Sequence, residues 1–153
     1  MKNAKNQKII TLLQAAYASE LETVANYLAN SAWLDGLRAA EVRESLERDI
    51  TDELGHARKL AHRLKQIGGR VPGSLDLERT QKSLQPPKES TDMRSVIDGV
   101  IDAEESAIAG YKKIIKASEG IDYVTQDLAI NLQADEEEHL TLFLGFRKSL
   151  EKE

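Results

Sequence analysis

Residues 46–69 read LERDITDELGHARKLAHRLKQIGG, and this stretch decides the class of fold. Its apolar residues recur at spacings of three, four and seven, which is the periodicity of one face of an α-helix. They are Leu46, Ile50, Ala57, Leu60, Leu64 and Ile67. The Gly68-Gly69 pair that follows supplies the left-handed stop at which many helices end. The pattern therefore predicts a helix over about residues 38–67.

The same periodicity appears three more times and predicts helices over about residues 5–34, 92–118 and 122–151. All three prolines lie between Pro72 and Pro87, so both halves of the chain are free of the residue that breaks helices. Residues 68–91 are then a long crossover, and no strand pattern competes. The sequence predicts an all-α, antiparallel four-helix bundle with one long crossover between the second and third helices, as a single domain over residues 1–153.

The composition fits a soluble helical domain. The 153 residues are 41% hydrophobic and 31% charged, which suits a chain with one core. The absence of cysteine excludes disulfides, zinc–thiolate sites and iron–sulfur clusters. A net charge of −5 makes nucleic acid an unlikely partner. No apolar run is long enough for a signal peptide or a membrane span, so we expect a cytoplasmic protein that does not contact membranes.

Each of the four apolar stripes carries one acid where a core should hold an apolar residue: Glu20, Glu53, Glu104 and Glu136. Burying an ionised carboxylate costs several kcal/mol. The cost of burying four unpaired carboxylates would exceed the free energy of unfolding of an ordinary domain. Lysines and arginines near these acids fall on flanking or outer faces by helical phase. Metal ions are the remaining strong counter-charge. The alternative is a bundle that binds no metal, with these carboxyl groups protonated or hydrated.

Two of the three histidines lie beside these acids. His56 follows Glu53 by three residues and His139 follows Glu136 by three, so each pair shares one face of its helix. Two such Glu-x-x-His units and two further glutamates make the ligand set of a dinuclear carboxylate site. The third histidine, His62, falls on another face and is expected at the surface.

The two halves of the chain repeat one pattern. Glu20 precedes Tyr27 by seven residues, and Glu104 precedes Tyr111 by seven, an offset of 84 between the halves. The Glu-x-x-His units are offset by 83. This two-fold layout suits a two-metal centre and favours Glu104 over its neighbour Glu105.

Two sets of residues near these motifs leave alternatives open. The two tyrosines are either plain core residues or donors to a ligating carboxylate. Asp49, Asp52 and Asp135 are either outer carboxylates on an ion path or solvated residues.

Carboxylate oxygens with one imidazole per metal suit iron or manganese. Two Fe(II) ions held in this way can deliver two electrons to O2 or H2O2. The ligand chemistry alone leaves the native metal and the oxidant open.

Four segments carry a resemblance to a known family: YASELETVANYL (17–28), DELGH (52–56), DAEESAIAGY (102–111) and DEEEH (135–139). They resemble the metal-binding segments of bacterioferritins and other ferritin-like di-iron carboxylate proteins, over about residues 8–148. The resemblance implies the ferritin-like bundle, ferroxidase activity, and iron storage or detoxification by a homo-oligomeric shell of 12 or 24 subunits. It implies two iron ions per subunit, held by the catalytic ligands Glu20, Glu53, His56, Glu104, Glu136 and His139. It also implies that Glu20 and Glu104 are terminal ligands and that Glu53 and Glu136 are bridges.

Two departures qualify the resemblance. Bacterioferritins bind haem through a methionine directly after the glutamate of the second helix, and Leu54 stands there instead. The methionines of this chain are Met1 and Met93, so no haem is expected. Only 14 residues follow His139, which leaves little room for a fifth helix. That shortness favours a smaller, Dps-like dodecamer as the alternative to a 24-subunit shell.

Two other functions compete with iron oxidation and storage. One is a manganese- or iron-dependent enzyme that consumes peroxide at the same site. The other is a Dps-type DNA-protecting protein, tethered through Lys2, Lys5 and Lys8. Metal analysis with a catalase assay would identify the first, and a gel shift lost on deleting residues 1–8 would identify the second.

Overall fold

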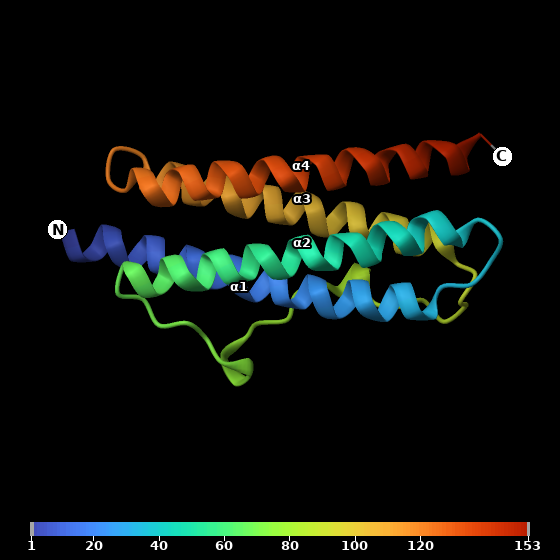
Figure 1. Cartoon of the computed structure of the whole chain (residues 1–153), viewed down its shortest axis with the longest axis horizontal. Coiled ribbons are helices and arrows are strands. Elements are labelled where there is room, and N and C mark those ends of the chain that lie inside the picture. Colours follow the sequence, from blue (N-terminus) through green and yellow to red (C-terminus); the bar gives the residue numbers. More distant parts are fainter. Residues whose placement is uncertain (1, 153) are drawn as a thin grey trace.

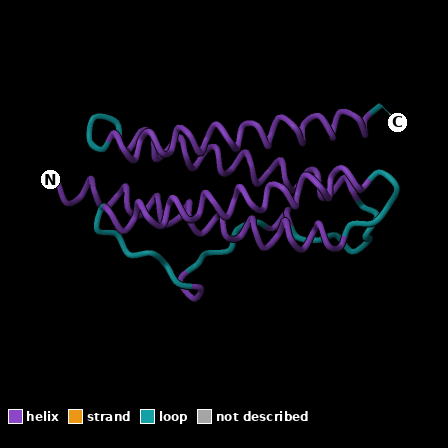
Figure 2. Tube along the Cα trace, viewed as in Figure 1, coloured by secondary structure: helices purple, strands orange, loops and turns teal. Residues whose placement is uncertain are grey.

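The structure is a computed structural model that describes residues 2–152, with side chains from residue 4 onward. It consists of four long helices, α1 (Lys2–Trp33), α2 (Ala39–Gln66), α3 (Met93–Ser118) and α4 (Tyr123–Glu151) (Figure 1). Figure 2 shows only helices and loops in the described part of the chain, which confirms the prediction of an all-α fold. Met1 and the side chain of Lys2, which entered the haem and DNA arguments, lie outside these residues.

The helices form two antiparallel hairpins, α1 with α2 and α3 with α4 (Figure 1). The hairpins dock mainly through α1 and α3, whereas α2 and α4 touch in few places. Helix α1 begins three residues before the predicted start at residue 5, and the other helix ends lie within one residue of the predicted bounds. The fold is therefore an up-down pair, a crossover and a second up-down pair.

Local sequence explains where the helices begin and end. Asp92 and Asp122 precede α3 and α4, and each side chain accepts a hydrogen bond from the backbone N–H three residues later. Gly68 and Gly120 follow α2 and α3 with φ of +81° and +68°. Residues other than glycine rarely adopt this backbone conformation. The hairpin turn and the start of the crossover are thus encoded by glycine.

The crossover, residues 67–92, runs the length of the bundle; its first part projects away from the helices, and its second part packs against α1 and α3 (Figure 1). It contains two short 3₁₀ helices, η1 (Ser74–Asp76) and η2 (Lys82–Leu84). Leu84 is buried, and its carbonyl accepts a hydrogen bond of 2.7 Å from the amide of Asn30. Gln81 donates at 2.6 Å to Thr23. Where the crossover passes α3, the helix has a glycine, Gly99. A Cβ at this position would lie 2.3 Å from the carbonyl oxygen of Ser83.

The core is divided into two apolar clusters along the bundle axis. One contains Leu46, Ile97 and Phe143, and the other contains Leu13, Leu60 and Leu132. On every helix the acidic positions of the repeat fall between the two clusters. The apolar periodicity of residues 5–34 predicts an inward stripe that includes Tyr27 and Leu28, but Leu28 is 59% exposed and belongs to neither cluster. The apolar clusters therefore enclose a polar layer in mid-bundle.

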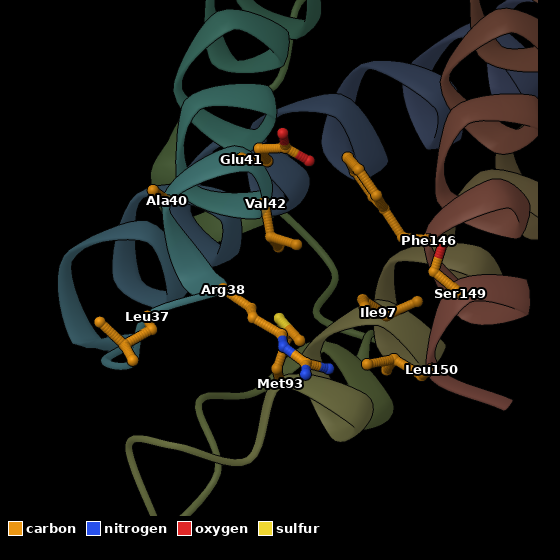
Figure 3. Close-up of a pocket in the computed structure, with 10 residues that line it drawn as sticks. All are labelled: Leu37, Arg38, Ala40, Glu41, Val42, Met93, Ile97, Phe146, Ser149 and Leu150. Carbon is orange, nitrogen blue, oxygen red and sulfur yellow. The ribbon is translucent and has the colours of Figure 1, made fainter. Parts of the chain in front are cut away.

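A surface pocket of about 460 Å³ lies at the end of the bundle where α2 and α3 begin and α4 ends (Figure 3). Its walls are mostly apolar side chains, with Arg38 and Glu41 as the charged ones. None of the acids or histidines of the polar layer lines it. In the described part of the chain, no helix has the length and apolarity to cross a membrane.

Candidate metal centre

Six side chains of the sequence repeat converge in the polar layer. They come from all four helices, and none is more than 7% exposed: Glu20, Glu53, His56, Glu104, Glu136 and His139. Their ligand atoms form two groups, and within each group all atoms lie within 4.8 Å of one another. The first group is Glu20, Glu53, His56 and Glu136, and the second is Glu53, Glu104, Glu136 and His139. Glu53 and Glu136 belong to both groups, which is the arrangement of two ion positions with two shared carboxylates.

The two imidazoles present their Nδ1 atoms to the carboxylates. His56 Nδ1 lies 3.0 Å from Glu136 Oε1 and 3.7 Å from Glu20 Oε2. His139 Nδ1 lies 3.0 Å from Glu53 Oε1 and 3.3 Å from Glu136 Oε2. The rings are nearly parallel, with centroids 6.4 Å apart. Each half of the chain thus places one nitrogen ligand on its own side of the shared carboxylates.

The outward-facing nitrogen of each imidazole meets an aspartate from the opposite hairpin. His56 Nε2 lies 2.9 Å from Asp135 Oδ2, and His139 Nε2 lies 3.2 Å from Asp52 Oδ2. Both aspartate side chains are 51% exposed. Such contacts fix which nitrogen carries the proton and leave Nδ1 free for a metal. The third aspartate, Asp49, is 2% exposed, and its Oδ1 lies 3.4 Å from His139 Nε2.

The two buried tyrosines are donors to the carboxylates. The hydroxyl of Tyr27 on α1 donates to Glu104 on α3, and that of Tyr111 on α3 donates to Glu20 on α1. Burial, and then the charge of the carboxylates, raise the pKa of both phenols well above the usual value. They therefore remain protonated donors, which settles the role that the sequence left open.

In the metal-free protein, two of the buried carboxyl groups, those of Glu53 and Glu136, hold their protons more tightly than usual. Burial, reinforced by the charge of Glu20, raises the pKa of Glu53 to about 8 and that of Glu136 to about 11. Burial also acts to raise the pKa of Glu20, but hydrogen bonds from Glu53, His56 and Tyr111 outweigh it, and the pKa is lowered. Glu20 is thus the most readily ionised of these three carboxyl groups.

The surrounding carboxyl groups favour the protonated form of both imidazoles in the metal-free protein. Burial lowers the pKa of His56 and His139, but the close approach of the surrounding glutamates outweighs this and raises both pKa values far above the usual one. Binding of a divalent ion at Nδ1 must therefore displace protons.

Several of these atoms lack a hydrogen-bond partner among the described residues: Glu20 Oε2, Glu53 Oε1, Glu104 Oε2, Glu136 Oε2 and His139 Nδ1. A buried polar atom left without a hydrogen bond costs about 1–3 kcal/mol, so five such atoms in one layer, four of them carboxylate oxygens, call for a ligand. No ion pair among the described residues joins a lysine or arginine to this layer. The donors are oxygens with one imidazole per group, a set that fits iron or manganese.

The neighbours of these residues lie as the helical phase predicted. His62 and Glu105 are exposed, as are the basic residues Arg48, Arg58, Lys112 and Lys113. Among the side chains that the structure describes, the two imidazoles are therefore the only groups of this layer that can carry a positive charge.

Comparison with known proteins agrees with this picture. The ferritin-like domain family matches residues 10–152. The DNA protection during starvation protein of Pyrococcus furiosus is 26% identical over 141 residues, covering 90% of this chain and 75% of its own. The bacterioferritin of Desulfovibrio desulfuricans is 26% identical over 140 residues, covering 91% of this chain and 74% of its own.

Two solved structures share the fold. A dodecameric thioferritin, the bacterioferritin-related protein of Bacteroides fragilis, matches with a TM-score of 0.83 at 23% identity, over 99% of this chain and 92% of its own. A ferritin-like diiron-carboxylate protein of Bacillus anthracis matches with a TM-score of 0.78 at 23% identity, over 94% of this chain and 97% of its own. The resemblance that the four sequence segments indicated is confirmed.

Proposed function

The chain belongs to the ferritin-like domain family, and from this premise we propose that it is a ferroxidase that oxidises Fe(II) at a two-iron site inside each bundle. The observation that carries the proposal is the pair of ligand groups joined by Glu53 and Glu136. Two ions of the same kind, placed side by side, can give up two electrons to one molecule of oxidant. A single isolated Fe(II) ion would give up only one electron.

The residues divide into three roles. Glu53 and Glu136 would bridge the two ions, because they belong to both groups. Glu20 and Glu104 are terminal ligands, held in place by the hydroxyls of Tyr111 and Tyr27. His56 and His139 complete the two positions through Nδ1.

The bound ions supply the two electrons that reduce O2 or H2O2. The protein supplies a buried layer that is closed above and below by apolar clusters. It also supplies carboxyl groups of raised pKa, which release protons as the ions bind. Asp52 and Asp135, half-exposed beside the imidazoles, connect this layer to the surface between α2 and α4.

We further propose that the oxidised iron is stored or detoxified in a shell of identical subunits in the cytoplasm. The support is the family itself and a structural relative described as dodecameric. Large apolar side chains on the surface of the single chain agree with subunit contacts, among them Leu37 at 105% exposure and Leu75 at 100%. A dodecamer and a 24-subunit shell are distinguished by sedimentation.

The test adds Fe(II) to metal-free protein under anaerobic conditions, then O2 or H2O2, and follows ferric absorbance with the ratio of iron to chain. We expect rapid oxidation of two Fe(II) per chain and slower oxidation of many more. Substitutions His56→Ala and Glu136→Ala should abolish the rapid phase, whereas His62→Ala on the exposed face of α2 should not. Iron uptake that stops at two ions per chain would contradict the proposal of iron storage. Unchanged Fe(II) oxidation in both site variants would contradict the proposal of ferroxidase activity.

A manganese-dependent enzyme that consumes peroxide would use the same ligands. Metal analysis of protein produced with both metals supplied, together with a catalase assay, separates it from a ferroxidase. Bound manganese with catalase activity would replace the proposal.

DNA protection is a second candidate, because one relative carries that name. Lys5 and Lys8 are exposed near the start of α1, but the net charge of −5 opposes DNA binding. A gel shift that disappears on deleting residues 1–8 would establish this function.

A further inference from the structure

The repeat that builds the site is broken at one buried position. An offset of 83 relates Asp52 to Asp135, Glu53 to Glu136 and His56 to His139. The same offset relates Asp49 on α2 to Leu132 on α4. Both are buried, at 2% and 0% exposure. One half of the bundle therefore holds a buried carboxylate where the other half holds a core leucine.

The broken position changes the surroundings of only one of the two imidazoles. His139 Nε2 faces two carboxylates, with Asp52 Oδ2 at 3.2 Å and Asp49 Oδ1 at 3.4 Å. His56 Nε2 faces one, with Asp135 Oδ2 at 2.9 Å. The second oxygen of Asp49, Oδ2, is buried without a hydrogen-bond partner among the described residues. Packing alone gives no reason for a carboxyl group at this place, since leucine serves at the equivalent position.

A carboxylate behind a ligating imidazole strengthens its metal bond. When Nδ1 binds an ion, the remaining proton is on Nε2, and an acceptor there orients the ring and raises its basicity. The effect is larger for a buried acceptor, because water screens it less. Asp52 beside His139 and Asp135 beside His56 are equally exposed and act alike on their imidazoles. The two imidazoles therefore differ in their surroundings through Asp49.

We propose that Asp49 is a positioning residue that makes the two ion positions unequal, so that a divalent ion binds more tightly beside His139 than beside His56. The inference rests on the proposed two-ion function. It assigns the order of loading: the position formed by Glu53, Glu104, Glu136 and His139 fills first, and the position beside His56 fills second.

The test isolates each position and uses Co(II) as the probe. In a His56→Gln background only the position beside His139 keeps its imidazole, and in a His139→Gln background only the position beside His56 does. Calorimetry and the visible absorbance of Co(II) give the affinity of each. Adding Asp49→Asn should weaken binding roughly tenfold in the first background and less than about twofold in the second. Asp135→Asn is the matched control and should show the reverse pattern.

The two backgrounds also test folding, because a variant that only damages the fold weakens Co(II) binding in both. Equal weakening in both backgrounds, or none in either, overturns the inference. Asp49→Leu, which copies the residue of the other half, provides a second variant and should give the pattern of Asp49→Asn. Failure of the unsubstituted protein to bind two Co(II) per chain would instead contradict the proposed function itself.

Discussion

The phenol of Tyr111 on α3 donates a hydrogen bond to Glu20 on α1, across the interface between the two hairpins. Tyr27 on α1 makes the reciprocal bond to Glu104 on α3. Each half of the repeat thus holds a buried carboxylate of the other half. The bonds join the helices through which the hairpins dock, so they serve both the site and the assembly of the bundle.

Replacing Tyr111 by phenylalanine should lower both the stability of the bundle and its affinity for a divalent ion. Glu20 would lose a donor while staying buried, which costs about 1–3 kcal/mol of unfolding free energy in the metal-free protein. Loss of a group that orients a ligand should also weaken Co(II) binding roughly tenfold. Urea unfolding and calorimetry measure the two effects. Tyr123→Phe is the control, because Tyr123 is 71% exposed at the start of α4.

The metal-free protein should lose stability as the pH rises from about 5 to 8. The folded state keeps a proton on Glu53 up to about pH 8, whereas the unfolded chain releases it near the ordinary value of 4.5. Asp49, with a pKa raised by burial to about 6, acts in the same direction at lower pH. The raised pKa values of the imidazoles add to the loss above pH 6.5.

Each extra proton held by the folded state lowers the unfolding free energy by about 1.4 kcal/mol per pH unit. Urea unfolding at several pH values measures the slope, and Glu53→Gln should make it shallower. Stability that increases between pH 5 and 8 would contradict the protonation described for this layer. A bound divalent ion replaces the protons, so Co(II) should stabilise the protein more at pH 8 than at pH 6.

The close approach of the crossover to α3 makes Gly99 sensitive to any side chain. A Cβ there would lie 2.3 Å from a backbone oxygen, so Gly99→Ala should destabilise the protein by about 1–3 kcal/mol. Gly110 lies on the same helix with nothing within 4 Å of an added Cβ. Gly110→Ala should therefore stabilise the protein by about 0.5–1 kcal/mol. Thermal unfolding of the two variants should shift in opposite directions.

Arg63 joins the end of α2 to the start of α4. Its guanidinium donates to both oxygens of Asp122 at 2.8 and 2.9 Å and to Thr125 Oγ1 at 2.9 Å. The two charged side chains are only 15% and 14% exposed, so Arg63→Ala should cost about 1–3 kcal/mol. Arg58→Ala, at an exposed position of the same helix, should change the unfolding free energy by less than about 0.5 kcal/mol.

The helices and the six candidate ligands could be predicted because each depends on spacing along one helix. Glu53 and His56 share a face whatever the rest of the chain does, and the repeat selects Glu104 over Glu105. The path of the crossover could not be predicted. It is held by contacts between distant residues, such as Asn30 with the carbonyl of Leu84, which leave no periodic pattern.

Helical phase also could not separate Asp49 from Asp52. Both lie on the side of α2 that faces α4, yet one is buried and the other half-exposed. Which of them lies under the neighbouring helix depends on how the two hairpins dock. Leu28 was misplaced for a related reason: it lies beside the buried Tyr27 in the sequence, but on a face of α1 that leaves its side chain 59% exposed in the single chain.

Each hairpin carries three of the six candidate ligands, two carboxylates and one imidazole. A single hairpin of this kind, associating with a copy of itself about a two-fold axis, would present the whole set. Joining the halves in one chain frees them to diverge, since a substitution no longer appears twice. Asp49 and Leu132 are one place where the two halves differ in this way.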